Sequence, residues 1–220
     1  MPLPPLFHHR LRVPVIGAPM FLVSLPHLVM AQCRAGVVGT FPHLNARTTG
    51  QLDAWLSEIE AGLPTAGDAP FGVNLVVHRT NPRLEPDLDV VVRHRVPLVI
   101  TCLGHPGRVA DAVHAYGGTV LCDVTGAEHA RKALDAGVDG LICVGAGAGG
   151  HASAQSAFSL VREIREFHDG CLVLGGAIGD GFQVRAAEVL GADLAYVGTR
   201  FLATQESAAA DDYKRMLVDA

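Results

Sequence analysis

The sequence has few aromatic residues, few charges and no apolar run long enough for a membrane helix. Aromatic side chains make up 5% of the 220 residues and charged ones 18%, whereas 49% are hydrophobic. Small aliphatic residues must therefore supply most of the core volume, which favours buried parallel strands packed closely against helices. The apolar zone at residues 13–30 is interrupted by Pro14, Pro19, Pro26 and His27, which excludes a membrane span there.

Basic clusters and paired cysteines are also missing. The formal net charge is −5 without a Lys/Arg cluster, so neither nucleic-acid binding nor attachment of a basic helix to a membrane is indicated. The five cysteines form no C-x-x-C pair, which argues against a zinc ribbon or a thioredoxin-type site. Free cysteines and the lack of a signal-peptide pattern predict a cytoplasmic protein. No set of His, Asp and Glu has metal-ligand spacing, so we expect no metal.

Strand-like apolar runs alternate with helical patterns along the chain. The strand-like runs are residues 13–18, 37–40, 71–75, 97–101, 119–123, 140–144, 171–174 and 194–197. The helical patterns are residues 26–35, 48–61, 88–94, 106–116, 127–136, 157–167, 182–190 and 211–219. This repetition predicts an α/β fold, a closed (β/α)8 TIM barrel, with residues 1–220 as a single domain.

An open doubly wound sheet is the alternative to the barrel. It is disfavoured because no G-x-G-x-x-G follows the first strand-like run. We expect the tail that begins at Thr204 to help close the barrel.

The loops that follow the strands meet at one end of such a barrel, where ligands bind. The loops after the seventh and eighth runs are rich in glycine, and barrels often bind phosphate there on backbone N–H groups and a helix N-terminus. The other interpretation is that these glycines only form tight turns. The residues expected to converge at this end are Ala18, Pro19, Met20, Asn74, Thr101, Asp123, Gly149, Gly150, His151, Gly175, Gly176, Gly198 and Thr199.

His151 follows a loop without bulky or charged residues. Residues 145–150 read Gly-Ala-Gly-Ala-Gly-Gly, directly after a strand-like run. Such a loop lets the backbone approach a flat or anionic ligand and then presents an imidazole that exchanges protons near neutral pH. We therefore predict His151 as the catalytic residue. Asp180 is predicted to cap the helix after the phosphate loop, and Asp123 either faces the site or caps the next helix.

Five segments together resemble the nitronate monooxygenase family, formerly called 2-nitropropane dioxygenases. They are residues 17–20, 72–74, 148–151, 175–181 and 198–204. The resemblance implies a flavin mononucleotide (FMN) barrel that oxidises alkyl nitronates with molecular oxygen to a carbonyl compound and nitrite. Its partners would then be a nitronate or nitroalkane and oxygen, and homo-oligomerisation stays open.

The same resemblance implies roles for individual residues. Gly17, Ala18, Pro19 and Met20 would lie against the flavin ring, and Asn74 would bond its polar edge. His151 matches the family's active-site histidine. The ribityl phosphate would be held by loop residues Gly150, Gly175, Gly176, Gly198 and Thr199, and Gly149 and Asp123 are also expected to bind the cofactor.

The chain departs from the family pattern in two places. Family members usually continue past the barrel into a C-terminal cover, most of which this sequence lacks. Some relatives carry Lys at the end of strand five, near the flavin, where this chain has Asp123. Alternatives therefore stay open: NAD(P)H-dependent reduction of a quinone or an enoyl thioester on the same fold, a catalytically silent flavin-binding barrel, or a phosphate-binding barrel without flavin.

Overall fold

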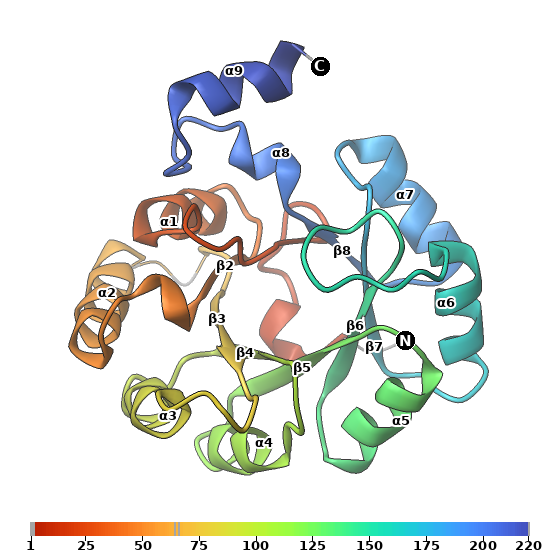
Figure 1. The fold of residues 1–220 in the computed structure, drawn as a ribbon, viewed down its shortest axis with the longest axis horizontal. Helices are drawn as coiled ribbons and strands as arrows, with labels where there is room; N and C mark the ends of the chain where they lie inside the picture. Colours follow the sequence, from red (N-terminus) through yellow and green to blue (C-terminus); the bar gives the residue numbers. More distant parts are fainter. Residues whose placement is uncertain (1–2, 64, 66, 220) are drawn as a thin grey trace.

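Eight parallel strands form one closed sheet in the computed structural model, which describes residues 3–63, 65 and 67–219 (Figure 1). The strands are β1 Val15–Gly17, β2 Gly39–Pro42, β3 Phe71–Val76, β4 Leu98–Cys102, β5 Thr119–Val124, β6 Gly140–Val144, β7 Cys171–Gly175 and β8 Leu194–Val197. Their order is β1-β8-β7-β6-β5-β4-β3-β2. The two ends of this sheet join through Val38, whose N–H donates to Val15 at 3.2 Å and whose carbonyl accepts from Gly17 at 2.8 Å. The predicted barrel is confirmed.

Helices surround the barrel on the outside (Figure 1). They are α1 Pro26–Arg34, α2 Thr49–Gly62, α3 Leu84–Arg93, α4 Gly107–His114, α5 Ala127–Asp135, α6 Ala157–Arg165 and α7 Gly181–Leu190. The short helix α8 (Thr199–Leu202), helix α9 (Asp211–Asp219) and the 3-10 turns η1 (Pro5–Phe7) and η2 (His43–Asn45) complete the described elements. None of the helices in the described part of the chain is both long and apolar enough to cross a membrane.

The core has two layers because strand residues alternate between the two faces of the sheet. The inner layer fills the barrel and includes Ile16, Leu98, Ile100, Leu121, Ile142, Val173 and Leu194. The outer layer packs strands against helices and includes Leu52, Val73, Val91, Val99, Val113, Leu141, Leu160 and Leu172. Phe7 of η1 is 2% exposed and belongs to the inner layer, so η1 closes the amino-terminal end of the barrel.

The second strand begins later than the predicted residue 37. Gly36 adopts φ +81°, and the N–H of Val37 donates to Gln32 as part of the turn that ends α1. Val37 therefore belongs to the helix termination, and regular pairing with β3 starts only at Gly39. Helix α3 begins earlier than predicted, at Leu84 rather than residue 88.

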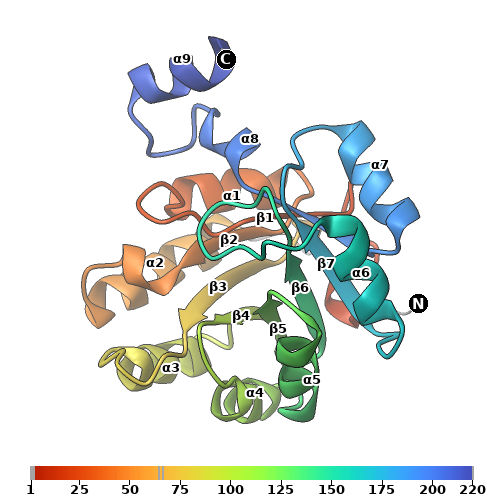
Figure 2. The ribbon, with the colours of Figure 1, turned by 45° about the vertical axis from the view of Figure 1, so that its right-hand side comes forward.

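The tail does not close the barrel, contrary to the prediction. Direct pairing of β8 with β1 does so, for example between Tyr196 and Ile16. The tail instead rests on the loop after β1, where Ala208 N–H donates to Val23 at 3.2 Å. Helix α9 stands away from the barrel in both views (Figure 2), and none of its described residues is buried.

A buried ionic network joins the loop after β2 to helix α3. His43 and Asp87 are both fully buried. His43 Nδ1 lies 2.6 Å from Asp87 Oδ2, Thr49 donates to Oδ1 at 2.6 Å, and Arg83 donates to Oδ2 at 2.7 Å. The Asn81 amide nitrogen is 3.3 Å from His43 Nε2, which assigns the donated proton to Nδ1. Burial raises the pKa of Asp87, but the bonds from His43, Thr49 and Arg83 outweigh it and hold that pKa below its ordinary value.

Replacing this carboxylate tests the network. Asp87→Ala is expected to lower the free energy of unfolding by about 3 kcal/mol at pH 7, because it leaves buried donors unpaired. Asp89→Ala, at an exposed position of the same helix, should change it by less than about 0.5 kcal/mol. Urea unfolding followed by circular dichroism measures both.

The same experiment has a defined pH dependence. The folded-state pKa of Asp87 is depressed, so its contribution is present above the unfolded-state pKa of about 4 and is lost as the pH falls through the lower folded-state value. The difference between wild type and Asp87→Ala should therefore shrink below about pH 4. A difference that stays constant on acidification would show that the carboxylate charge is not what stabilises this region.

Candidate active site

The loops that follow the strands all open at the carboxyl end of the barrel, the end that faces the viewer in Figure 1. This follows from the parallel pairing of every strand with its neighbours. The loops after β7 and β8 are adjacent at this end because Gly175 pairs with Tyr196. The structure thus brings the predicted segments together. We call the opening of the barrel at this end the mouth, and strand alternation decides which side chains face it.

Four polar side chains point into the barrel at this end. Asn74, Asp123 and Tyr196 occupy inward positions of β3, β5 and β8, and Cys102 follows the inward Ile100 on β4. Thr101 does not belong to this set, contrary to the prediction. It is fully buried in the outer layer, where its hydroxyl donates to Leu121 at 3.3 Å.

Asn74 and Cys102 contact each other, whereas two neighbouring oxygens have no partner. The Asn74 amide nitrogen donates to Ile100 at 3.3 Å and lies 3.4 Å from Cys102 Sγ. Asp123 Oδ1 and the Tyr196 hydroxyl oxygen are buried and form no hydrogen bond within the described residues. Buried polar groups in proteins normally have partners, so these two oxygens mark a place for a polar ligand.

Burial controls the ionisation of these groups. It raises the pKa of Asp123 to about 7, although the residue as a whole retains some exposed surface. It raises the pKa of Cys102 to about 12 and that of Tyr196 well above 10, and the nearby Asp123 charge adds to both shifts. Small changes of pH around neutrality therefore convert the Asp123 carboxyl between its neutral and its charged form.

The loop after β1 is held firmly at one side of the mouth. Met20 N–H donates to Ser24 Oγ at 2.9 Å, and the Asn45 side-chain amide donates to Met20 O at 3.1 Å. Ala18 N–H donates to Val197 at 2.8 Å. These bonds fix residues 18–20 beside the loop that follows β8.

Gly17 packs closely against helix α1. A Cβ there would be 2.2 Å from Nε2 of Gln32, which is buried on α1. Its N–H donates to Val38, and its carbonyl accepts from Thr40. Gly17 therefore serves close packing of α1 on β1.

The loops after β6 and β7 are tied together through their backbones. Gly145 N–H donates to Gly175 at 3.0 Å, and Ala177 N–H donates to Gly147 at 3.2 Å. Gly176 has φ +130°, and a Cβ there would be 3.0 Å from the carbonyl oxygen of Ala146. Its conformation therefore requires glycine.

Helix α7 begins with a capping box. Asp180 caps it, as predicted: Gln183 N–H donates to the Asp180 carboxylate at 2.9 Å, and the Gln183 side chain accepts from Asp180 N–H at 3.2 Å. The same side chain accepts from Gly179 N–H at 2.6 Å. The capping box therefore satisfies the N–H groups of Gly179, Asp180 and Gln183, whereas those of Gly181 and Phe182 donate to no acceptor within the described residues.

Free amides are also found in the loops themselves. Within the described structure, the N–H groups of Gly176, Gly198 and Thr199 donate to no acceptor, and neither does the Thr199 hydroxyl. Met20 lies next to Gly198, since a Cβ built at Gly198 would be 3.6 Å from its sulfur. Unpaired amides at neighbouring turns are suited to an anionic group.

His151 lies at the exposed tip of the loop after β6. The base of this loop is closed by bonds from Ser153 N–H to Val144 at 2.9 Å and from Ala146 N–H to Gln155 at 2.8 Å. The tip extends over the carboxyl end of the barrel (Figures 1 and 2). Nothing lies within 4 Å of a Cβ built at Gly149 or Gly150, although Gly150 has φ +73°, and the described residues offer no hydrogen-bond partner to the His151 side chain. The imidazole is therefore available to a ligand.

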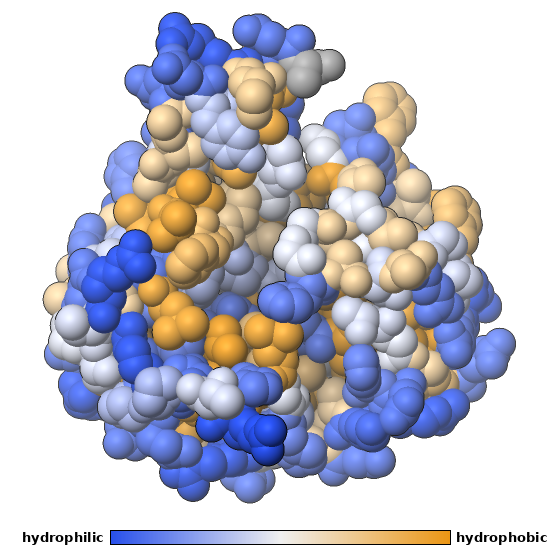
Figure 3. Space-filling model, in the orientation of Figure 1, coloured by the Kyte–Doolittle hydropathy of each residue, from blue (hydrophilic) through white to orange (hydrophobic). Residues whose placement is uncertain are grey.

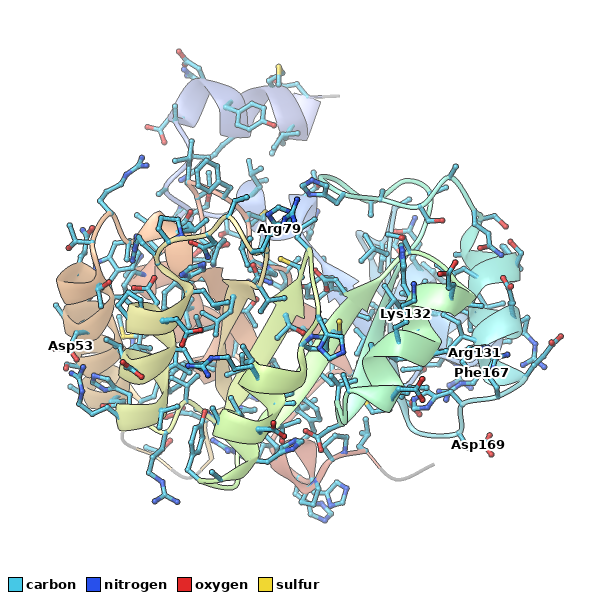
Figure 4. The ribbon with its side chains drawn as sticks, turned by 60° about the horizontal axis from the view of Figure 1, so that its bottom comes forward. Asp53, Arg79, Arg131, Lys132, Phe167 and Asp169 are labelled. Atoms are coloured by element: carbon cyan, nitrogen blue, oxygen red, sulfur yellow. The ribbon has the colours of Figure 1, made fainter. Side chains whose placement is uncertain are left out.

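The rim of the mouth is partly apolar. Phe21 and Leu22 are 60% and 52% exposed after β1, and Leu103 is 42% exposed after β4. In the space-filling view onto this end, apolar residues gather on the side of α1, β3 and β4, facing the loop after β6 across a hollow (Figure 3). Arg79, exposed on the loop after β3, lies above the strands at the same end (Figure 4).

Two surface cavities lie at the other end of the barrel. They have volumes of about 180 and 290 Å³ and are lined by residues that precede β3, β4 and β5, including Pro70, Pro97 and Gly118. Neither contains the inward polar residues or the glycine-rich loops. The candidate active site is therefore at the carboxyl end. Among the described residues, no group of three metal-ligating side chains is present.

Comparison with known proteins gives the family. The family model described as nitronate monooxygenase matches residues 81–220, which contain β4 to β8 and all the glycine-rich loops. The chain belongs to the nitronate monooxygenase family.

Members and structural neighbours of this family differ in their reactions. A Rhodococcus jostii protein named (3aS,4S,5R,7aS)-5-hydroxy-7a-methyl-1-oxo-octahydro-1H-indene-4-carboxyl-CoA dehydrogenase is 30% identical over 202 residues, covering 91% of this chain and 55% of the relative. FabK from Thermotoga maritima has a TM-score of 0.87 at 29% identity, over 96% of this chain and 66% of that one. A nitroalkane oxidase from Streptomyces ansochromogenes has a TM-score of 0.83 at 27% identity, over 96% and 72%. The chain spans about half the length of the first relative.

Sequence reasoning missed two residues of this site. Cys102 is not among the residues expected to converge at the carboxyl end, and Tyr196 lies within the strand-like run 194–197 without a predicted role. Their common signal is alternation: Cys102 lies two residues after the inward Ile100, and Tyr196 two after the inward Leu194. That signal identifies the inward face only once the neighbouring strands are known.

Gly176 provides a test of the loop geometry. Gly176→Ala is expected to lower the free energy of unfolding by about 1–3 kcal/mol, because alanine is strained at φ +130° and its Cβ meets the Ala146 carbonyl. Gly181→Ala is the control, since nothing lies within 4 Å of a Cβ there, and it should leave stability unchanged or slightly higher. Equal stabilities of the two variants in urea would contradict this description of the loop.

Proposed function

We propose that the chain binds FMN at the carboxyl end of the barrel and oxidises alkyl nitronates with molecular oxygen to a carbonyl compound and nitrite. The observation that carries this proposal is the combination of groups at one end of the barrel. Unpaired amides of Gly176, Gly198 and Thr199 open beside two buried oxygens without partners, those of Asp123 and Tyr196. Amides suit a phosphate, and the buried oxygens suit the polar edge of a ring.

The phosphate is assigned to the loops after β7 and β8. Gly175 and Gly176 supply a turn without side chains that a phosphate can approach closely. Gly198 supplies an amide, and Thr199 supplies an amide and a hydroxyl. Gly149 and Gly150 add open backbone from the loop after β6. This arrangement stabilises a charged group without reorganisation, because the backbone dipoles are already fixed by the fold.

The ring is assigned to the space between the loop after β1 and the inward polar residues. Ala18, Pro19 and Met20 form one wall, held by Ser24 and Asn45. Asn74 and Asp123 then offer polar atoms to the ring edge. Bound there, FMN would supply the redox chemistry that couples oxidation of the nitronate to reduction of oxygen. The protein's part is to orient both ligands and keep water from the ring.

His151 is assigned to the substrate. Its exposed place on the loop over the mouth lets it hydrogen-bond the nitro oxygens of a nitronate. With a neutral nitroalkane, the same imidazole removes the α-proton as a general base. Arg79 at the rim adds a positive charge that favours the approach of an anion.

One observation favours a second candidate function. The Rhodococcus relative is named for a carboxyl-CoA substrate, which supports an alternative in which FMN mediates NAD(P)H-dependent reduction of an enoyl thioester or a quinone. The two functions differ in the electron donor. Under anaerobic conditions, propionate 3-nitronate bleaches the flavin if the first is correct, whereas only NADH or NADPH does so if the second is correct. A flavin inert to every donor would identify a silent flavin-binding barrel.

Replacement of His151 tests its role. His151→Asn should retain bound flavin and lose turnover by about 100-fold or more, measured as nitrite release and oxygen uptake. His9→Asn is the control, because His9 is exposed at the opposite end of the barrel and has φ +59°, which asparagine tolerates. Turnover of His151→Asn equal to that of His9→Asn would remove His151 from the mechanism.

Thr199 provides a separate test of the phosphate assignment. Thr199→Val removes one hydroxyl and should weaken FMN binding by about tenfold, since hydrogen bonds to charged groups are stronger than neutral ones. Riboflavin lacks the phosphate and should bind both proteins equally. Fluorescence titration of flavin-depleted protein measures both ligands, and a variant that loses riboflavin and FMN affinity alike would place the phosphate elsewhere.

A further inference from the structure

Two buried oxygens at the floor of the mouth have no partner in the described structure, Asp123 Oδ1 and the Tyr196 hydroxyl. Asp123 is on strand β5, two residues after the inward Leu121. Tyr196 is on strand β8, two residues after the inward Leu194. Of the neighbouring polar side chains, Asn74 donates to Ile100 and contacts Cys102. Asp123 and Tyr196 are therefore the inward polar side chains with an oxygen that has no partner in the described structure.

The position of the Tyr196 ring is restricted by its neighbour on β7. A Cβ added to Gly175 would lie 3.2 Å from Cδ1 and 3.3 Å from Cβ of Tyr196. The missing side chain at position 175 leaves room for the aromatic ring beside β7. The hydroxyl is consequently buried inside the barrel rather than turned toward solvent.

No ionised partner balances the Asp123 carboxyl. The titratable groups coupled to it in the described structure are the thiols of Cys102 and Cys122 and the Tyr196 hydroxyl. Burial raises the pKa values of the two thiols to about 12 and about 11, so both are neutral at physiological pH. Burial also raises the pKa of Asp123 itself to about 7. A ligand that covers the mouth removes further water and favours the neutral acid.

We propose that Asp123, as the neutral acid, and Tyr196 together donate a pair of hydrogen bonds to acceptor atoms on the polar edge of the flavin ring. The proton that binding requires at higher pH is taken from solvent and stays on the Asp123 carboxyl. This inference rests on the proposed binding of FMN. It assigns Asp123 a protonation state, and it adds Tyr196 as a binding residue.

The pH dependence of FMN affinity tests the Asp123 half. If only the neutral acid binds the ring, the apparent Kd of wild type rises by about tenfold between pH 6 and pH 8 relative to Asp123→Asn, because the competent fraction falls by that factor. The asparagine amide keeps a donor but cannot ionise. The FMN phosphate, His151 and His105, which lies on the loop between β4 and α4, are the same in both proteins, so their effects cancel in the ratio.

The outcomes of this titration are distinct. A ratio of wild-type to Asp123→Asn Kd that changes by less than about threefold over this range, with FMN bound by wild type, overturns the inference and leaves the proposed function standing. Wild-type protein that binds no FMN at either pH overturns both. A ratio that follows the expected rise supports both.

Tyr196→Phe tests the second half. It should weaken FMN binding by about fivefold at both pH values, the effect of one neutral hydrogen bond, while Tyr213→Phe, at an exposed position on α9, leaves it unchanged. The stability of the ligand-free protein separates binding from structure. Because the hydroxyl has no partner within the described residues, its removal should not lower the midpoint of urea unfolding. Unchanged FMN affinity, or a clear loss of ligand-free stability, would overturn the role of Tyr196.

Discussion

Parallel hydrogen bonding that closes the sheet is the constraint on which the rest of this structure depends. Strand β1 pairs with β8 on one side and bonds Val38 on the other. Because every strand runs in the same direction, the loops that follow them share one end of the barrel. Residues as distant in sequence as Met20 and Gly198 thereby become neighbours. Without closure, the loop after β1 would not face the loop after β8.

Alternation along the strands then divides polar residues between two environments. Thr101 and Cys102 are consecutive, yet Thr101 bonds the backbone of the outer layer while Cys102 meets Asn74 inside the barrel. On β3, β4, β5 and β8 the inward positions nearest the mouth carry Asn74, Cys102, Asp123 and Tyr196, whereas the deeper inward positions of β4, β5 and β8 are aliphatic. Burial of Asp123 and Tyr196 without partners is costly for the ligand-free protein. That cost is consistent with residues kept for binding rather than for stability.

The loops around the mouth combine rigid and open parts. Backbone bonds join the loops after β6 and β7, and the Asp180 capping box fixes the start of α7. The ionic network of His43 and Asp87 holds the loop after β2 against α3. By contrast, the His151 side chain and the N–H groups of Gly198 and Thr199 make no hydrogen bonds in the described structure. Such a division places groups for a ligand on supports that need not rearrange when it binds.

Local patterns in the sequence were sufficient for the barrel, for the cap at Asp180 and for the glycine-rich turns, because periodicity, capping and positive φ involve only nearby residues. Tertiary structure alone decided that Gly17 makes room for Gln32, that Cys102 rather than Thr101 faces the mouth, and that Tyr196 lies beside Gly175. These outcomes depend on the register between strands and on which helix packs against each strand. Neighbours of that kind are set by the closed sheet as a whole, so no single segment encodes them.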